Sequence, residues 1–163
     1  MVKVTFRKRT FSSFSQFLKE MFGLLKDWRQ IRKAMRSEVI SPAFRERLML
    51  AVTEVYKCRY CTYAHSKEAL KHGIDQFEMD QILSGEFEKC PRSEIPAILY
   101  AQHWAESDGH PQAESLNKLK EYYSAKEIEY IHLYLRMIRL GNLTGNSWDY
   151  ILSRLPFVRR YNK

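Results

Sequence analysis

Apolar residues recur at every third or fourth position along most of the chain, which is the spacing of helices that turn one face toward a core. The first run extends over 11–35, with Lys and Arg opposite its apolar stripe. Later runs predict helices over 42–56, 58–73, 75–83, 93–106, 112–123, 125–140 and 147–155. Residues 1–10 have no lasting period, so an irregular or extended lead is expected there.

Several helix ends are marked by residues that satisfy free backbone groups. Ser41 followed by Pro42 is a hydroxyl cap with proline at the first helical position. Ser124, with Glu127 three residues later, has the spacing of a capping box. The polar run 142–146 contains a glycine and predicts a break between the last two helices.

The composition favours an all-helical protein. Glycine and proline number six and five among 163 residues, whereas good helix formers dominate. A hydrophobic content of 45% suffices for one domain with a core, and no apolar run is long enough to span a membrane. We therefore predict an all-α helical bundle in one domain at 41–163, preceded by a basic N-terminal arm with an amphipathic helix at 1–40.

The net charge is concentrated in this arm. Residues 1–36 hold ten Lys or Arg against Glu20 and Asp27, a net of +8, whereas 17 basic and 17 acidic residues cancel in the remainder. The amphipathic helix is expected to pack its apolar stripe on the domain or on a neighbouring subunit. A membrane-surface helix and a nucleic-acid contact remain alternatives, so contact of residues 1–36 with an anionic surface stays open.

The candidate chemistry lies in a thiol pair followed by an imidazole. If 58–73 is helical, Cys58, Cys61 and His65 share one face, and the thiols lie at the helix start, where the macrodipole stabilises a thiolate. His65 is placed to accept the proton of Cys61, and Cys58 can resolve a sulfenic acid on Cys61 to a disulfide. This order predicts a peroxidatic Cys61 and a resolving Cys58.

The spacing Glu46-x11-Cys58-x2-Cys61-x3-His65 resembles the signature of the alkylhydroperoxidase D-like (AhpD-like) branch of the carboxymuconolactone decarboxylase superfamily. The resemblance covers roughly residues 41–155 and is most specific at 45–65. It implies that Cys61 is the reactive cysteine, that Cys58 resolves it, and that Glu46 and His65 relay protons. The chain departs from the pattern at Tyr60, where well-understood members have a further histidine.

The rise per residue of an α-helix does not by itself place Glu46 beside the thiols. At about 1.5 Å per residue, Glu46 lies about 18 Å before Cys58 and His65 about 10 Å beyond it. In a plain antiparallel hairpin the two side chains are out of register. Their convergence is implied by the resemblance, and it requires a crossing angle, a shorter helix or a bridging water.

These features predict a thiol-disulfide oxidoreductase with peroxidase-like activity. Its substrate is expected to be a hydroperoxide or a protein disulfide, a reducing thiol partner restores the pair, and no cofactor is needed because cysteine supplies the electrons. The family resemblance also implies a homo-oligomer, often a trimer or hexamer. Three cysteines do not make a secreted disulfide framework and no signal peptide is evident, so a cytoplasmic location is expected.

Other interpretations of the motif remain open. A bare Cys-x-x-Cys also occurs in zinc sites, but the fourth ligand would have to be Cys90, Glu46 or a distant histidine. A structural thiol pair without activity is a second alternative. A third is a decarboxylase of the same superfamily, whose members generally lack the pair, and a fourth is a non-catalytic protein whose basic arm binds an anionic surface.

The remaining thiol and imidazoles are expected to be structural. Cys90 is expected to be a packed thiol, and His72 to contact a helix end. His103 and His110 are expected to be structural or solvated. His132 is expected to face the core rather than the thiols.

Overall fold

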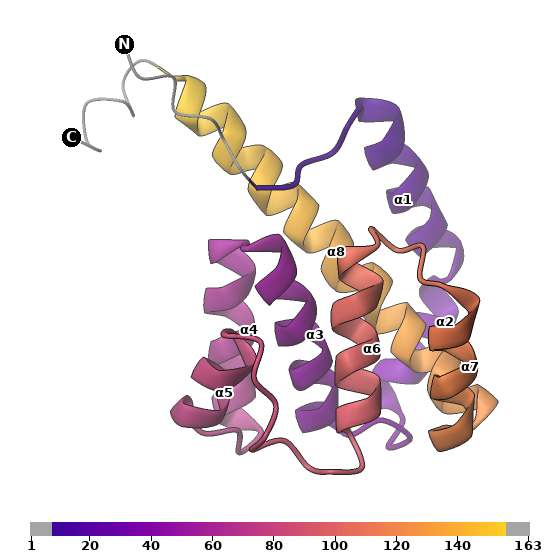
Figure 1. Ribbon diagram of the computed structural model, residues 1–163. Helices are drawn as coiled ribbons and strands as arrows, with labels where there is room; N and C mark the ends of the chain where they lie inside the picture. The colour runs from indigo at the N-terminus through magenta and orange to yellow at the C-terminus, as the bar shows by residue number, and fades with distance from the viewer. Residues whose placement is uncertain (1–7, 156–163) are drawn as a thin grey trace.

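The computed structural model describes residues 8–155, and within them the protein is all-α, as predicted. Eight helices and no strand occur in this part of the chain (Figure 1). The helices are α1 (Phe14–Lys26), α2 (Trp28–Arg36), α3 (Pro42–Tyr56), α4 (Arg59–Lys71), α5 (Gln76–Ile82), α6 (Ile95–Glu106), α7 (Ala113–Tyr122) and α8 (Ala125–Arg154). Residues 1–7, the first seven of the predicted lead, lie outside the described residues.

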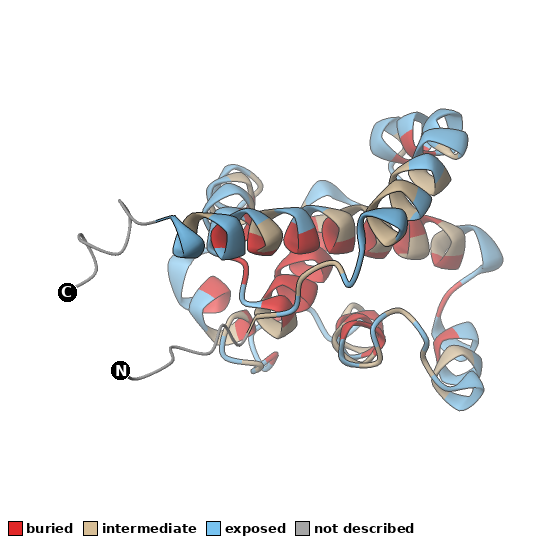
Figure 2. Ribbon diagram, turned by 90° about the horizontal axis from the view of Figure 1, so that it is seen from above, coloured by how far each residue is buried: buried red, intermediate tan, exposed pale blue. Residues whose placement is uncertain are grey.

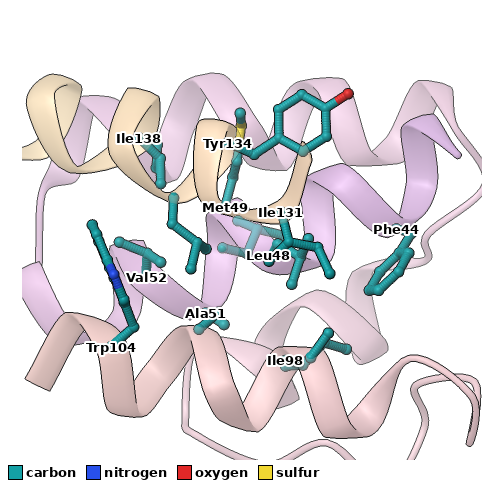
Figure 3. Packing of buried hydrophobic residues seen from close by; sticks show 14 of the residues in the cluster. Phe44, Leu48, Met49, Ala51, Val52, Ile98, Trp104, Ile131, Tyr134 and Ile138 are labelled. Carbon is teal, nitrogen blue, oxygen red and sulfur yellow. The ribbon is translucent and has the colours of Figure 1, made fainter. Parts of the chain in front are cut away.

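Helix α3 is the centre of the bundle. It packs against α6 on one side and α8 on the other, and α4 folds back beside it. Figure 3 shows Leu48 and Val52 of α3 between Ile98 of α6 and Ile131 and Ile138 of α8. Ten of its fifteen residues are buried, which is typical of a helix enclosed by neighbours. Figure 2 shows buried residues on several helices, and α3 carries ten of them.

The helix ends in the middle of the chain agree with the predictions. Helices α3 to α7 begin and end within two residues of the predicted ranges. The Ser41 hydroxyl caps α3 by accepting from the backbone N–H of Phe44 at 3.1 Å. Ser124 and Glu127 form the predicted capping box at the start of α8. Local side-chain chemistry therefore sets these ends.

The predicted break at 142–146 is wrong, because α8 runs unbroken for 30 residues. Asn142 and Asn146 are fully buried, and their side-chain amides bond to Thr53 Oγ1 and to the Tyr56 carbonyl oxygen of α3. The polar run is thus the inward face of a helix. Tertiary hydrogen bonds compensate for the low helix propensity of asparagine and glycine.

The single helix predicted over 11–35 is divided into α1 and α2 at Asp27. The Asp27 carboxylate accepts from Arg136 of α8 at 2.6 Å, and Glu20 of α1 pairs with Arg139 of α8. The predicted apolar stripe packs on α8 in part only, because no residue of α1 is fully buried. No helix within residues 8–155 has the length and apolarity needed to cross a membrane.

Two ion clusters, each centred on a buried arginine, connect helices that lie far apart in sequence. Arg47 of α3 pairs with Glu78 of α5 at 2.6 Å and with Glu94, before α6, at 3.0 Å. Arg139 of α8 pairs with Asp108, in the turn after α6, at 2.9 Å. Each cluster fixes the position of a short element or a turn relative to the central helices.

Candidate redox site at the start of α4

The site begins at a tight turn between two antiparallel helices. Lys57 ends α3 in the left-handed conformation, with φ of 54°, and Cys58 is the N-cap residue of α4. The Cys58 sulfur accepts from the backbone N–H of Cys61 at 3.4 Å. The thiol therefore takes the place that a Ser or Asp side chain normally occupies at a helix start.

The two motif sulfurs lie together, as the helical spacing predicts. Cys58 Sγ and Cys61 Sγ are 2.8 Å apart, and both cysteines are free thiols. Cys58 is fully buried, whereas Cys61 is 9% exposed. A small movement of either side chain would bring the sulfurs to the length of a disulfide bond, which is about 2.05 Å.

The helix start makes the two thiols ionise unequally. The pKa of Cys58 is lowered to about 6, chiefly by the hydrogen bond with the Cys61 side chain. The backbone N–H groups of Tyr60 and Cys61 and the charge of Lys8 also lower it, whereas burial opposes the shift. The same hydrogen bond, together with burial and the Cys58 charge, raises the pKa of Cys61. Cys58 is therefore the more acidic thiol of the pair.

Two glycines of α8 provide the space for the sulfurs, and sequence reasoning missed both. A Cβ at Gly145 would lie 2.7 Å from Cys58 Sγ, so no other residue fits there without movement. A Cβ at Gly141 would lie 3.9 Å from Cys61 Sγ, an ordinary contact. The Gly-x-x-x-Gly spacing on a helical face is the available signal, whereas the polar run 142–146 by itself predicts a break.

Glu46 and His65 meet directly. Glu46 Oε2 is 2.7 Å from His65 Nδ1, and Glu46 Oε1 accepts from Arg45 Nε at 3.0 Å. Helix α3 has its full predicted length and the contact is direct, so neither a shorter helix nor a bridging water brings the two side chains together. An ionised Glu46 makes Nδ1 the donor, which leaves Nε2 to exchange a proton.

Tyr60 lies on the outer side of the thiol pair. Its side chain is within van der Waals reach of Gly145, and the Arg59 guanidinium lies over its ring, 4.8 Å from the centroid. Arg59 and Lys8 both pair with Asp149 of α8, at 2.7 Å and 3.1 Å. Burial raises the pKa of Asp149, but hydrogen bonds from Lys8 and Tyr60 outweigh it and lower the value.

An open hollow of about 580 Å³ adjoins this turn. Lys57 and Arg59, the neighbours of Cys58, contribute to its wall, as does Thr62, whose hydroxyl donates to the Cys58 carbonyl oxygen at 3.0 Å. The hollow therefore opens on the backbone that carries the thiols. Neither Cys58 nor Cys61 contributes to its wall, and their sulfurs lie against α8 instead.

The other predicted residues lie away from the pair. Cys90 is buried, and burial raises its pKa to about 12. His132 lies 2.8 Å from the Tyr100 hydroxyl in the α6–α8 contact, as expected for a core histidine. His72 ends α4 and pairs with Glu68 at 3.4 Å. Within residues 8–155, no three His, Cys, Asp or Glu side chains are grouped to hold a metal ion.

A scan against models of known protein families finds no match, and no curated protein matches the chain. The site combines a buried pair of free thiols with an imidazole–carboxylate pair one helical turn further along α4.

Proposed function

We propose that the chain is a thiol-disulfide oxidoreductase with peroxidase-like activity, in which Cys61 attacks the substrate and Cys58 resolves the product. The supporting observation is the pair of free thiols 2.8 Å apart at a helix start. The substrate is a hydroperoxide or a partner's disulfide. A reducing thiol partner, as found in a reducing cytoplasm, restores the dithiol, and the two cysteines carry the electrons without a cofactor.

Cys61 is the sulfur that an incoming substrate meets, because it is exposed in part whereas Cys58 is fully buried. Its raised pKa means that its proton must leave before attack. The Cys58 thiolate is a base within hydrogen-bond reach of that proton. Proton transfer to Cys58 leaves the nucleophilic thiolate on Cys61.

The cycle balances in two steps. Attack of the Cys61 thiolate on a hydroperoxide breaks the O–O bond, which leaves a sulfenic acid on Cys61 and an alkoxide that takes the proton from Cys58. The Cys58 thiolate then attacks the sulfenic sulfur and forms the disulfide. The hydroxide released becomes water with one proton from His65 or solvent. Two electrons pass to the peroxide, and the reducing partner returns two.

Glu46 and His65 act as the proton relay in this proposal. The Glu46 carboxylate holds Nδ1 of His65, so that Nε2 is the nitrogen that gives or takes a proton. Arg45 holds the other carboxylate oxygen and keeps Glu46 in place. His65 lies four residues after Cys61 on the same helical face, which suits it to protonate the departing hydroxide.

The test is a count of free thiols before and after one equivalent of hydroperoxide under native conditions. The chain should lose two of its three thiols. The Cys90→Ser variant is the matched control and should also lose two, whereas Cys61→Ser should lose none. In Cys58→Ser, the sulfenic acid on Cys61 should persist and react with dimedone.

An unchanged thiol count in the unsubstituted chain overturns the proposal. Dimedone labelling of Cys58 in the Cys61→Ser variant, without labelling of Cys61 in Cys58→Ser, would reverse the two roles. Circular dichroism of each variant separates loss of chemistry from loss of fold.

A further inference from the structure

The outer side of α1 and α2 carries large apolar side chains that nothing in the described part of the chain covers. These side chains are between 43% and 72% exposed: Phe14, Phe22, Leu25, Trp28 and Met35. At about 100° per residue, the first three fall within an arc of about 80° on α1. We call this surface, formed by residues 14–36, the arm face. The two helices that carry it pack beside α8 (Figure 1).

The charges of the arm face have one sign. The two acidic residues within α1, α2 and the junction between them, Glu20 and Asp27, pair with Arg139 and Arg136 of α8. Six cationic residues of the two helices are exposed: Lys19, Lys26, Arg29, Arg32, Lys33 and Arg36. The fold has therefore turned both carboxylates inward and left the cations on the outside. A surface of this kind combines exposed aromatic and aliphatic groups with uncompensated positive charge.

We propose that the arm face binds the surface of an anionic lipid bilayer. Phe14, Phe22, Leu25 and Trp28 enter the boundary between headgroups and acyl chains, and the flanking cations pair with the lipid phosphates and carboxylates. This combination is typical of helices that lie in the membrane interface. Each cation near such a surface adds to binding, and the contribution falls off within a Debye length. The inference stands on the arm alone and is independent of the redox proposal.

The charge pattern favours a bilayer over the other occupants of such a face. Two copies of the chain that joined their arm faces would bring six cations against six, and like charges across an interface oppose association. A nucleic acid would satisfy the cations, but it offers no apolar medium for Leu25 or Met35. An anionic bilayer satisfies both the charge and the apolar side chains.

The test is co-sedimentation of the full chain with vesicles. Vesicles of phosphatidylcholine with phosphatidylserine should bind the chain, vesicles of phosphatidylcholine alone should bind it at least about tenfold more weakly, and added salt should release it. The double variant Phe22→Ser/Leu25→Ser should lose about tenfold or more of the binding. Its matched control is Leu70→Ser, since Leu70 is 52% exposed on α4.

A charge variant gives a second and independent measurement. Lys19→Glu/Lys26→Glu should weaken binding to the anionic vesicles by about tenfold or more, whereas Lys67→Glu on α4 should leave it unchanged. All four variants replace exposed side chains, so their helical circular dichroism should match that of the unsubstituted chain. Their loss of two thiols with hydroperoxide should also be unchanged, which separates failure of this inference from failure of the redox proposal.

Three results overturn the inference. The first is equal binding to vesicles with and without phosphatidylserine. The second is binding to a nucleic-acid duplex but not to vesicles. The third is an oligomer that Phe22→Ser/Leu25→Ser dissociates while vesicle binding is absent, because the arm face would then be a subunit contact.

Discussion

At the scale of single residues, the start of α4 decides how two neighbouring thiols divide one proton. Cys58 is the cap residue and receives hydrogen bonds, whereas Cys61 lies within the first turn and donates one. Identical side chains three residues apart thus acquire opposite pKa shifts. The hydrogen bond between the two sulfurs is the largest cause of both shifts, and the backbone N–H groups at the helix start add to the lowering at Cys58.

The first prediction concerns the ionisation of Cys58. Thiolate ultraviolet absorbance of the reduced chain should rise with pH, with a midpoint near 6. In Cys61→Ala the midpoint should move upward, because the hydrogen bond that contributes most to the lowered pKa is lost. Cys90→Ser should leave it in place. A midpoint near 8.5, the ordinary value for cysteine, would contradict the prediction.

The second prediction compares the two glycines of α8. Gly145→Ala should slow the loss of thiols with hydroperoxide by about tenfold and destabilise the fold by about 1–3 kcal/mol, since its Cβ would overlap Cys58 Sγ. Gly141→Ala is the matched control, because its Cβ meets Cys61 Sγ at 3.9 Å. It should be neutral or stabilise by up to about 1 kcal/mol. Equal effects at the two positions would show that Gly145 has no special contact.

At the scale of elements, α8 shows the limit of inference from local sequence. Asn and Gly in 142–146 indicate a loop when they are considered one by one. In the structure the same residues bond to α3 and accommodate the thiols, so the helix continues. Caps such as Ser41 and Ser124 were predictable because their partners lie within three residues. The partners of Asn146 lie about ninety residues and more away, which no local pattern encodes.

The third prediction concerns Asn146. Its side-chain amide donates to the carbonyl oxygens of Tyr56 at 2.8 Å and Arg9 at 3.0 Å. Asn146→Ala should lower the free energy of unfolding by about 1–3 kcal/mol, because buried carbonyl groups lose their donor. Thr144→Ala, at an exposed position on the same helix, should change it by less than about 0.5 kcal/mol. Urea denaturation measures both, and similar losses at the two positions would contradict the assigned role.

At the scale of the whole molecule, charged side chains join parts of the fold in addition to the apolar core. Arg47 joins α3 to α5 and to the segment before α6. Burial raises the pKa of Glu94 even though Arg47 acts in the opposite direction. The sequence predicted the all-α fold, but it did not indicate which charges would be buried, because pairing across the fold depends on how the helices pack. The expected trimer or hexamer stays a prediction.

The fourth prediction concerns this cluster. Arg47→Met leaves Glu78 and Glu94 buried without their cation and should cost about 3–5 kcal/mol at neutral pH. Burial already raises the pKa of Glu94, and removal of Arg47 takes away the charge that opposes this shift. The loss of stability should therefore shrink as the pH falls through the folded pKa of Glu94. Lys118→Met removes an exposed ion pair with Glu114 and should cost less than about 1 kcal/mol. A loss in Arg47→Met that does not depend on pH would contradict the prediction.

Asp149 is the counter-ion of two cations that come from distant parts of the chain, Lys8 ahead of α1 and Arg59 beside Cys58. The positive charge of Lys8 also reaches Cys58 and adds to the lowering of its pKa. If Lys8 moved away, Asp149 would keep its ion pair with Arg59. Cys58 would lose the charge of Lys8, and its thiolate would become more basic. Displacement of Lys8 would in this way raise the pKa of Cys58.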